Sequence, residues 1–137
     1  MAVTRLRQAL WPDTLEMHRR AVEGYLQGDN PHIDKVLVAE SSAGELMGFI
    51  ELRIRNYAEG SEQAAVPCIE DWFVVPEQRG KRIGAKLVEA AEAWARDGGF
   101  DEIASDTVFD NLSAQQAHEA LGFEEVERTV HYLKSLR

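Results

Sequence analysis

The sequence has only one cysteine, Cys68, among its 137 residues. A single thiol cannot form an intramolecular disulfide, and no histidines and cysteines are spaced as zinc ligands. We therefore expect no bound metal. We also expect Cys68 to be a small packed side chain rather than a nucleophile.

Long apolar runs are absent as well. No stretch approaches the roughly 18 consecutive apolar residues of a transmembrane helix, and residues 1–8 lack the apolar region of a signal peptide. Repeats and a Pro/Gly/Ser-rich linker are also missing, while 45% hydrophobic and 28% charged residues are ordinary for a globular protein. We therefore expect residues 1–137 to form one domain around one core, in the cytoplasm and away from membranes.

Positive charge is scarce. Lys and Arg number 15 against 24 Asp and Glu, which gives a net charge of -9 at pH 7. Such a charge disfavours nucleic acids and anionic membranes as partners and favours the approach of cations. Several of the few positive side chains nevertheless gather within residues 76–86, where acidic residues are rare. This distribution predicts an anion site within a body that attracts cations.

Hydrophobic periodicity and turn residues predict the element order α-α-β-β-β-α-β-α-β. Strands are expected at residues 35–40, 46–55, 66–75, 103–107 and 125–133. One helix is expected to end at residue 10, and others to span residues 15–26, 83–97 and 113–121. This order predicts an α+β fold, an α/β sandwich with a mixed sheet.

A basic segment, residues 79–85 (RGKRIGA), connects the third expected strand to the long helix. Unpaired backbone N–H groups at a helix N-terminus bind phosphate oxygens, glycine allows close backbone approach, and arginine adds bidentate contacts. Basic helix starts are also common on solvated surfaces, so the segment alone leaves both interpretations open. It is neither a P-loop nor a dinucleotide fingerprint, because the required Gly-Lys-Ser/Thr and glycine spacing are missing.

The surrounding motifs resemble the GNAT acetyltransferase superfamily from about residue 36 to the C-terminus. Val-Val-Pro at 74–76 and Gln-Arg-Gly-x-x-Ile-Gly-x-x-Leu at 78–87 precede the long helix, and Asn111 and Leu-Gly-Phe at 121–123 come after it. The resemblance implies a mixed, mostly antiparallel sheet flanked by helices, with acetyl-CoA as cosubstrate. It also implies that the strand backbone holds the pantetheine arm and the basic loop the pyrophosphate. The residues implied in cofactor binding are Trp72, Phe73, Val74, Arg79, Gly80, Lys81, Arg82, Ile83, Gly84, Ala85 and Asn111.

The sequence also departs from this family. Arg82 stands where the family loop usually has glycine, and Asp71 replaces the glycine that usually follows the family's glutamate. The family's N-terminal strand has no counterpart, so we expect it to be missing from the fold, and an uncovered sheet edge would invite association. Family members are often dimers, so the resemblance implies a homodimer.

Several short strings are similar to aminoglycoside 6′-N-acetyltransferases. They are Trp11-Pro12, residues 52–60, IEDWFV at 69–74, residues 104–106, residues 110–111, and AHEALGFEEVER at 117–128. This narrower resemblance implies acetyl transfer to the 6′-amine of an aminoglycoside antibiotic, and hence antibiotic resistance. The residues it places in the substrate pocket are Trp11, Tyr57, Glu70, Asp106 and Glu127.

The acceptor chemistry requires such residues. An aminoglycoside carries several ammonium groups, and each charge-assisted contact with a carboxylate contributes about 1.5–3 kcal/mol before desolvation. Attack on the thioester requires the neutral amine, so a carboxylate must accept a proton, and either Glu70 or Asp106 is our hypothesis for this base. A backbone N–H of residues 72–74 is expected to stabilise the oxyanion. His118 occupies the position where many GNAT enzymes have a tyrosine that acts on the departing sulfur, and an imidazole titrates near neutrality, so His118 is a candidate for that role.

Two other functions are left open. One is a GNAT enzyme that acetylates another amine, such as a polyamine, a small metabolite or a peptide N-terminus, since the acidic loop at residues 59–62 would attract any cation. The other is a noncatalytic acyl-CoA-binding sensor, in which Arg82 and Asp71 mark eroded catalysis.

Overall fold

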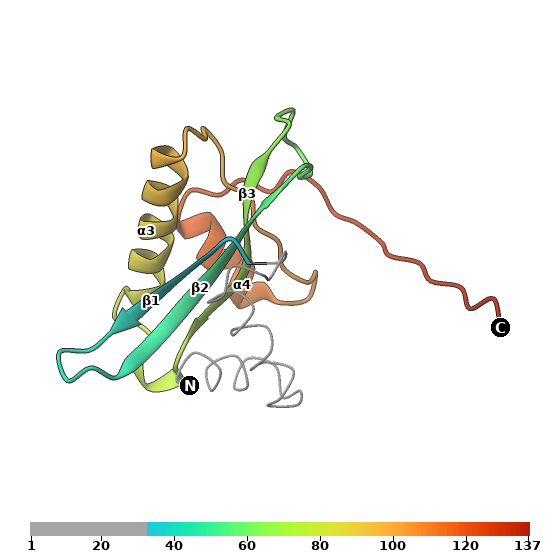
Figure 1. Cartoon of the computed structure of the whole chain (residues 1–137). Coiled ribbons are helices and arrows are strands. Elements are labelled where there is room, and N and C mark those ends of the chain that lie inside the picture. The colour runs from blue at the N-terminus through green and yellow to red at the C-terminus, as the bar shows by residue number, and fades with distance from the viewer. Residues whose placement is uncertain (1–32) are drawn as a thin grey trace.

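The computed structural model of the chain describes residues 33–137 (Figure 1). Three of the expectations from the sequence concern parts of the chain outside these residues. They are the helices before residue 27, the pocket residue Trp11 and the absence of the family's N-terminal strand. The described elements are β1 (Lys35–Glu40), β2 (Leu46–Arg55), β3 (Val66–Val74), the 3-10 turn Pro76–Gln78, α3 (Ile83–Asp97) and α4 (Leu112–Ala120). The bounds predicted for β1, β2 and α3 are confirmed; β3 ends one residue earlier than predicted, and α4 both begins and ends one residue earlier.

The three strands form an antiparallel sheet in the order β1-β2-β3. A tight turn joins β1 to β2, where the N–H of Gly44 donates to the carbonyl of Ser41 at 2.9 Å. Gly44 has φ 81°, a conformation that favours glycine. The turn therefore aligns two strands that both contribute apolar side chains to the core against the helix, among them Leu37, Ala39, Ile50 and Leu52.

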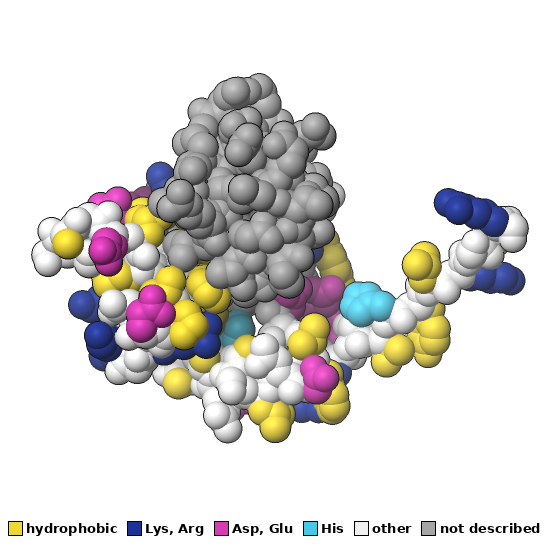
Figure 2. Space-filling view, turned by 90° about the horizontal axis from the view of Figure 1, so that it is seen from below, with side chains coloured by type: hydrophobic (Ala, Val, Ile, Leu, Met, Phe, Trp, Pro, Cys, Tyr) yellow, Lys and Arg dark blue, Asp and Glu magenta, His cyan; other side chains and the backbone are white. Residues whose placement is uncertain are grey.

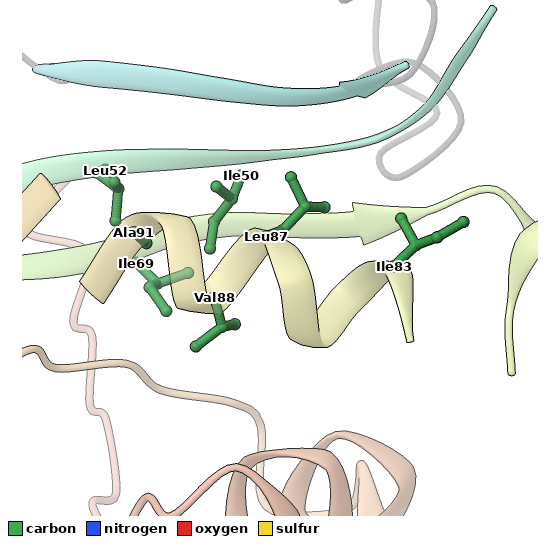
Figure 3. Close-up of a cluster of buried hydrophobic side chains, with 7 residues drawn as sticks. All are labelled: Ile50, Leu52, Ile69, Ile83, Leu87, Val88 and Ala91. Carbon is green, nitrogen blue, oxygen red and sulfur yellow. The ribbon is translucent and has the colours of Figure 1, made fainter. Parts of the chain in front are cut away.

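One face of this sheet packs against α3 and forms the main core (Figure 3). Apolar residues recur along α3 at intervals of three and four, which places them on one face of the helix. The cluster consists of Ile50, Leu52 and Ile69 from the sheet and Ile83, Leu87, Val88 and Ala91 from α3. This packing fixes the first turn of α3 beside the C-terminal end of β3.

The strand predicted at residues 103–107 is reduced to a single parallel bridge between Cys68 and Ala104. The N–H of Ile69 donates to the Ala104 carbonyl at 2.8 Å, and the N–H of Ala104 donates to the Pro67 carbonyl at 2.9 Å. No further ladder bond to β3 follows among the described residues, so the prediction of a strand was wrong. The sheet is mixed, as predicted, through this one bridge.

The strand predicted at residues 125–133 does not form, which corrects that prediction. These residues have no secondary structure. Val126 lies against Gly60 and Arg128 lies over the Phe109 ring, and the chain then runs away from the body as an extended segment (Figure 1). A strand needs a neighbour for its N–H and C=O groups, and residues 33–137 supply none to this segment. The alternating sequence therefore gives an extended backbone without a sheet. Separately, no helix in the described part of the chain is long and apolar enough to cross a bilayer.

Helix α3 begins at a strained residue. Arg82 is the N-cap, with φ 65° and ψ 16°, and it is the only residue other than glycine with positive φ in the described range. A β-carbon in this conformation costs roughly 1–2 kcal/mol. The family's glycine at this position is thus explained by backbone geometry.

Replacing Arg82 by glycine should therefore stabilise the protein. We expect Arg82→Gly to raise the free energy of unfolding by about 1 kcal/mol, measured by urea denaturation, because glycine adopts positive φ without the β-carbon clash. Arg82→Ala is the matched control, since it removes the guanidinium but keeps the β-carbon. Equal stability of the two variants would show that the strain at Arg82 is negligible.

Candidate functional site

The basic loop leads from the end of β3 into α3. Gly80 takes φ 81° within it, and the first bond of the helix runs from the N–H of Lys86 to the carbonyl of Arg82 at 3.0 Å. The N–H groups of residues 83–85 come before this bond and have no carbonyl partner within the helix, as is true of the first N–H groups of any helix. They lie beside exposed Arg and Lys side chains. Main-chain donors and positive charge therefore coincide at one point, as a pyrophosphate site requires.

Arg79 is held at the end of β3. Its Nε donates to the Val74 carbonyl at 2.9 Å, and its guanidinium lies 5.5 Å from the centre of the Phe73 ring. The remaining guanidinium donors are exposed to solvent. Arg79 is thus anchored on one side and able to bind an anion on the other.

Trp72 lies between the N-terminal turn of α3 and α4. A β-carbon on Gly84 would come 3.3 Å from the indole ring, and the ring of His118 is 5.3 Å from the indole centre in a T-shaped arrangement. The indole Nε1 is buried and has no hydrogen-bond partner among the described residues. A buried donor without an acceptor is costly, so this N–H favours a ligand that brings an acceptor.

A pocket opens beside the Cys68–Ala104 bridge, and both bridge residues line it. It is a shallow depression that is open to solvent. Its lining residues are Arg55, Tyr57, Ala58, Glu59, Cys68, Ile69, Glu70, Ala104, Ser105 and Asp106. The structure thus brings together the predicted pocket residues Tyr57, Glu70 and Asp106, and adds the carboxylate of Glu59.

A β-bulge places Glu70 in this pocket. Glu51 pairs with Asp71 and Leu52 pairs with Ile69, so Glu70 is an extra residue on β3. A bulge re-aims a side chain and changes the alternation of the strand. Asp71 is 7% exposed and does not line the pocket, so this departure from the family adds no carboxylate there.

Arg55 is a pocket residue that the sequence analysis missed. Its Nε and Nη2 donate to the two carboxylate oxygens of Glu70 at 2.9 and 2.6 Å. This hydrogen-bonded pairing raises the pKa of Arg55, against the opposing effect of burial. The presence of opposite charges on adjacent strands could have suggested this ion pair. The pairing depends on the strand register, however, and the register is set by the bulge, which the sequence does not reveal.

His118 has both ring nitrogens in hydrogen bonds. Nδ1 lies 2.6 Å from the Ala114 carbonyl oxygen, and Nε2 lies 2.7 Å from Oγ of Ser105. The ring also packs edge-on against Phe123, with centroids 5.3 Å apart. His118 is therefore joined to the pocket through Ser105.

Glu127 does not line the pocket, but it follows Val126, which lies against the pocket loop, residues 57–60. A β-carbon on Gly60 would lie 2.8 Å from Cβ of Val126. Asn111 is the N-cap of α4, where its Oδ1 accepts from the N–H of Ala114 at 3.1 Å. The structure thus gives Asn111 a capping contact and leaves Glu127 one residue from the pocket loop.

The profile of the Acetyltransferase (GNAT) family matches residues 3–123 of the sequence. The chain belongs to the GNAT acetyltransferase family. Its sequence relatives include an aminoglycoside N(6′)-acetyltransferase type 1 of Klebsiella aerogenes, 42% identical over 132 residues that cover 96% of this chain and 87% of the relative. Another, from Stenotrophomonas maltophilia, is 36% identical over 132 residues, 96% of this chain and 84% of the relative.

Solved structures give the same fold for this GNAT protein. AAC(6′)-Iy in complex with the bisubstrate analogue CoA-S-monomethyl-acetylneamine aligns with a TM-score of 0.89 and 34% identity, over 98% of this chain and 90% of that chain. AAC(6′)-Ih from Acinetobacter baumannii aligns with a TM-score of 0.85 and 32% identity, over 99% of this chain and 91% of that chain. The predicted α+β fold is confirmed.

The residues present fit coenzyme A, so this GNAT protein uses acetyl-CoA as its cosubstrate. The N–H groups at the start of α3 and the basic side chains would hold the pyrophosphate, and the unpaired indole N–H of Trp72 offers a donor to the cofactor's amide-containing arm. The N–H of Val75 donates to Met47 on β2, so the alternation of the strand turns the N–H groups of Trp72 and Val74 to the free edge. No group of His, Cys, Asp and Glu side chains within residues 33–137 is arranged to hold a metal.

Cys68 is 6% exposed and packs with Ala58, Val66 and Ala104. Burial raises the pKa of its thiol, which keeps the sulfur neutral. The expectation of a packed side chain is confirmed, and direct transfer from thioester to amine requires no protein nucleophile.

Removing the guanidinium of Arg79 should weaken cofactor binding. We expect Arg79→Ala to raise the Kd for acetyl-CoA about tenfold or more, because a charge-assisted hydrogen bond contributes about 1.5–3 kcal/mol. Isothermal titration calorimetry measures this constant. Arg96→Ala removes the same charge from the last turn of α3 and should leave the Kd unchanged. An unaltered titration of Arg79→Ala would refute the assignment of the loop.

Proposed function

We propose that this GNAT protein is an aminoglycoside 6′-N-acetyltransferase that confers antibiotic resistance. The pocket carries the proposal, because Glu59, Glu70 and Asp106 surround a site for a cation. Ammonium groups of an aminoglycoside bind such carboxylates by charge-assisted hydrogen bonds. The names of the sequence relatives and of the solved structures support the same substrate class.

The amine and the thioester meet along β3. Glu70 lies at the bulge, and the free N–H groups of Trp72 and Val74 follow it towards the basic loop. A cofactor bound along this edge would present its acetyl group to an amine in the pocket. The free N–H of Trp72 or Val74 would then stabilise the oxyanion of the tetrahedral intermediate.

Asp106 is our choice for the base that makes the amine neutral. Both carboxylate oxygens of Glu70 already accept hydrogen bonds from Arg55, so Glu70 is engaged within the protein. Asp106 lines the same pocket without such a hydrogen bond within residues 33–137. We assign Glu70 the role of orienting the substrate, and Tyr57 and Glu127 those of contacting the sugar.

We expect Asp106→Asn to lower kcat about 10²–10⁴-fold for kanamycin, because it removes a general base. Acetyl-CoA binding should be unchanged. Release of free thiol from acetyl-CoA measures the rate, and NMR of the product shows which nitrogen is acetylated. Asp101→Asn is the matched control, since Asp101 is exposed and does not line the pocket.

Three outcomes distinguish the possible functions. Acetylation of kanamycin at the 6′-nitrogen, lost in Asp106→Asn, supports the proposal. Turnover of spermine or a peptide but not kanamycin would indicate a GNAT enzyme for another amine. Binding of acetyl-CoA without turnover of any amine would indicate a sensor.

We also propose a homodimer that forms through the C-terminal arm, residues 124–137. Its large apolar side chains are more than half exposed, namely Val126, Val130, Tyr132, Leu133 and Leu136. Figure 2 shows hydrophobic side chains along the arm and Lys and Arg at its tip. From residue 128 onward the arm has Arg and Lys but no acidic residue, which complements the acidic remainder of a second copy.

The arm also belongs to the shared fold, because AAC(6′)-Iy aligns over 98% of this chain. An extended segment with unpaired main-chain groups and exposed apolar side chains is suited to strand pairing with another chain. A second copy offers the same arm in return, and such reciprocal contacts are typical of two-fold dimers.

Charges on the apolar face of the arm should abolish the dimer. We expect Val130→Asp/Tyr132→Asp to be a monomer and the wild-type protein to be a dimer, with molar masses measured by light scattering after gel filtration. His131→Asp is the control, because successive residues of an extended chain face opposite sides. A monomeric wild-type protein at micromolar concentration would contradict the dimer.

We further propose that residues 1–137 form one domain that works in the cytoplasm. The family profile, which spans residues 3–123, supports one domain. The cosubstrate supports the location, because acetyl-CoA is an intracellular metabolite.

A further inference from the structure

Acetylation removes two protons from the acceptor nitrogen. The ammonium group carries three protons, and the amide product keeps one. One of the two ends on the sulfur of coenzyme A, and the other is released to solvent. Asp106 holds only one proton at a time, so a second group beside the pocket that carries the other proton would let both transfers occur within one turnover.

Ser105 is placed to provide it. The residue lines the pocket and follows Ala104, the last residue bridged to β3. Its Oγ lies 2.7 Å from Nε2 of His118. The serine therefore connects the pocket to an imidazole.

The direction of these hydrogen bonds follows from the other ring nitrogen. Nδ1 of His118 lies 2.6 Å from the carbonyl oxygen of Ala114, which can only accept. Nδ1 must therefore carry a hydrogen, and Nε2 of the neutral ring is an acceptor. It follows that the Ser105 hydroxyl donates to His118. The remaining lone pairs of Oγ are left to accept a proton from the pocket.

We propose that Ser105 is a catalytic residue and that Ser105 and His118 form a proton relay between the acceptor nitrogen and the coenzyme A sulfur. This inference rests on the proposed function. The substrate N–H bond breaks and its proton passes to Oγ of Ser105, while the original hydroxyl proton moves to Nε2 of His118. His118 is then an imidazolium that donates to Ser105, and the new hydroxyl proton of Ser105 faces the pocket.

The relay is reset when the thioester breaks. The electron pair of the carbon–sulfur bond leaves with the sulfur, and the Ser105 hydroxyl gives its proton to this thiolate. Nε2 of His118 returns its proton to Ser105. The other proton of the acceptor nitrogen passes to Asp106 and then to solvent, so the overall reaction is balanced.

This route explains why His118 need not reach the sulfur. Both of its nitrogens are hydrogen-bonded within the protein, and its ring is packed against Trp72 and Phe123. Direct donation would require one of these bonds to break. Donation through Ser105 keeps the ring in place, and His118 acts as a positioning residue that also stores the proton.

The relay is tested by variants that keep the shape of the site. His118→Gln retains an oxygen that can accept from Ser105 but cannot take up a proton. We expect His118→Gln and Ser105→Ala each to lower kcat at least about 10²-fold, the effect of losing general acid–base catalysis. The KM for kanamycin, the Kd for acetyl-CoA and the Tm should stay at the wild-type values. Ser105→Thr, which keeps the hydroxyl, should restore most of kcat.

A spectroscopic measurement tests the geometry without any substrate. Long-range ¹H–¹⁵N NMR distinguishes the two neutral tautomers of histidine, and the signals that vanish in His118→Gln identify this residue. We expect the Nδ1–H tautomer. The Nε2–H tautomer would overturn the relay, as would wild-type kcat in Ser105→Ala or a loss confined to KM or Tm.

The relay and the proposed substrate fail separately. If wild-type protein acetylates another amine but not kanamycin, the proposed substrate is wrong, and the same variants are compared with that amine. If kanamycin is acetylated and Ser105→Ala is fully active, the substrate stands and the relay is wrong. No turnover of any amine by wild-type protein would overturn both.

Discussion

The pairing of β3 is the constraint on which the site depends. One edge of this strand is bonded to β2 along its length, while the other is bonded to Ala104 at a single bridge. Beyond the bridge, free main-chain groups remain along the strand towards the basic loop. Between the bridge and these free groups, the bulge at Glu70 turns a carboxylate into the pocket. The hydrogen bonds of this one strand thus position both the strand edge that would hold the cofactor and the pocket that would hold the acceptor.

The core of α3 keeps these two sites in register. Leu87 and Val88 pack against the sheet, so the N-terminus of the helix cannot move relative to β3 without opening a close-packed cluster. Trp72 adds a second link, because its indole touches the position of Gly84 and the ring of His118. The cofactor donors and the proton-carrying groups are therefore held by the same few side chains.

Local signals were enough to predict most of the fold. β1, β2 and α3 matched because turn residues and hydrophobic periods are encoded within each segment. The strands at residues 103–107 and 125–133 failed because a strand exists only where another strand pairs with it. The alternation of Val126, Val130 and Tyr132 predicts which side chains lie on the same side of an extended chain, but it does not predict which other strand, if any, pairs with this segment.

The candidate site, like the fold, was predicted where the signal lies within one segment and missed where it depends on contacts between segments. Tyr57, Glu70 and Asp106 were found through short motifs, and the structure brings them into one pocket. Arg55 and Ser105 were missed because their importance comes from partners across the sheet and on α4. At Arg82, by contrast, the sequence comparison was informative. The glycine that the family usually has there indicated a special backbone conformation, and the structure shows a positive φ at this residue.

The Arg55–Glu70 pair has a consequence for selectivity. Because a guanidinium already occupies Glu70 through two hydrogen bonds, the pocket carries less free negative charge than its three carboxylates suggest. A sodium or potassium ion has little to gain by displacing so well-oriented a counter-ion. In the proposed function, a molecule with several ammonium groups would engage Glu59 and Asp106 at once. The Arg55–Glu70 pair would thereby favour amines that carry several charges over those that carry one.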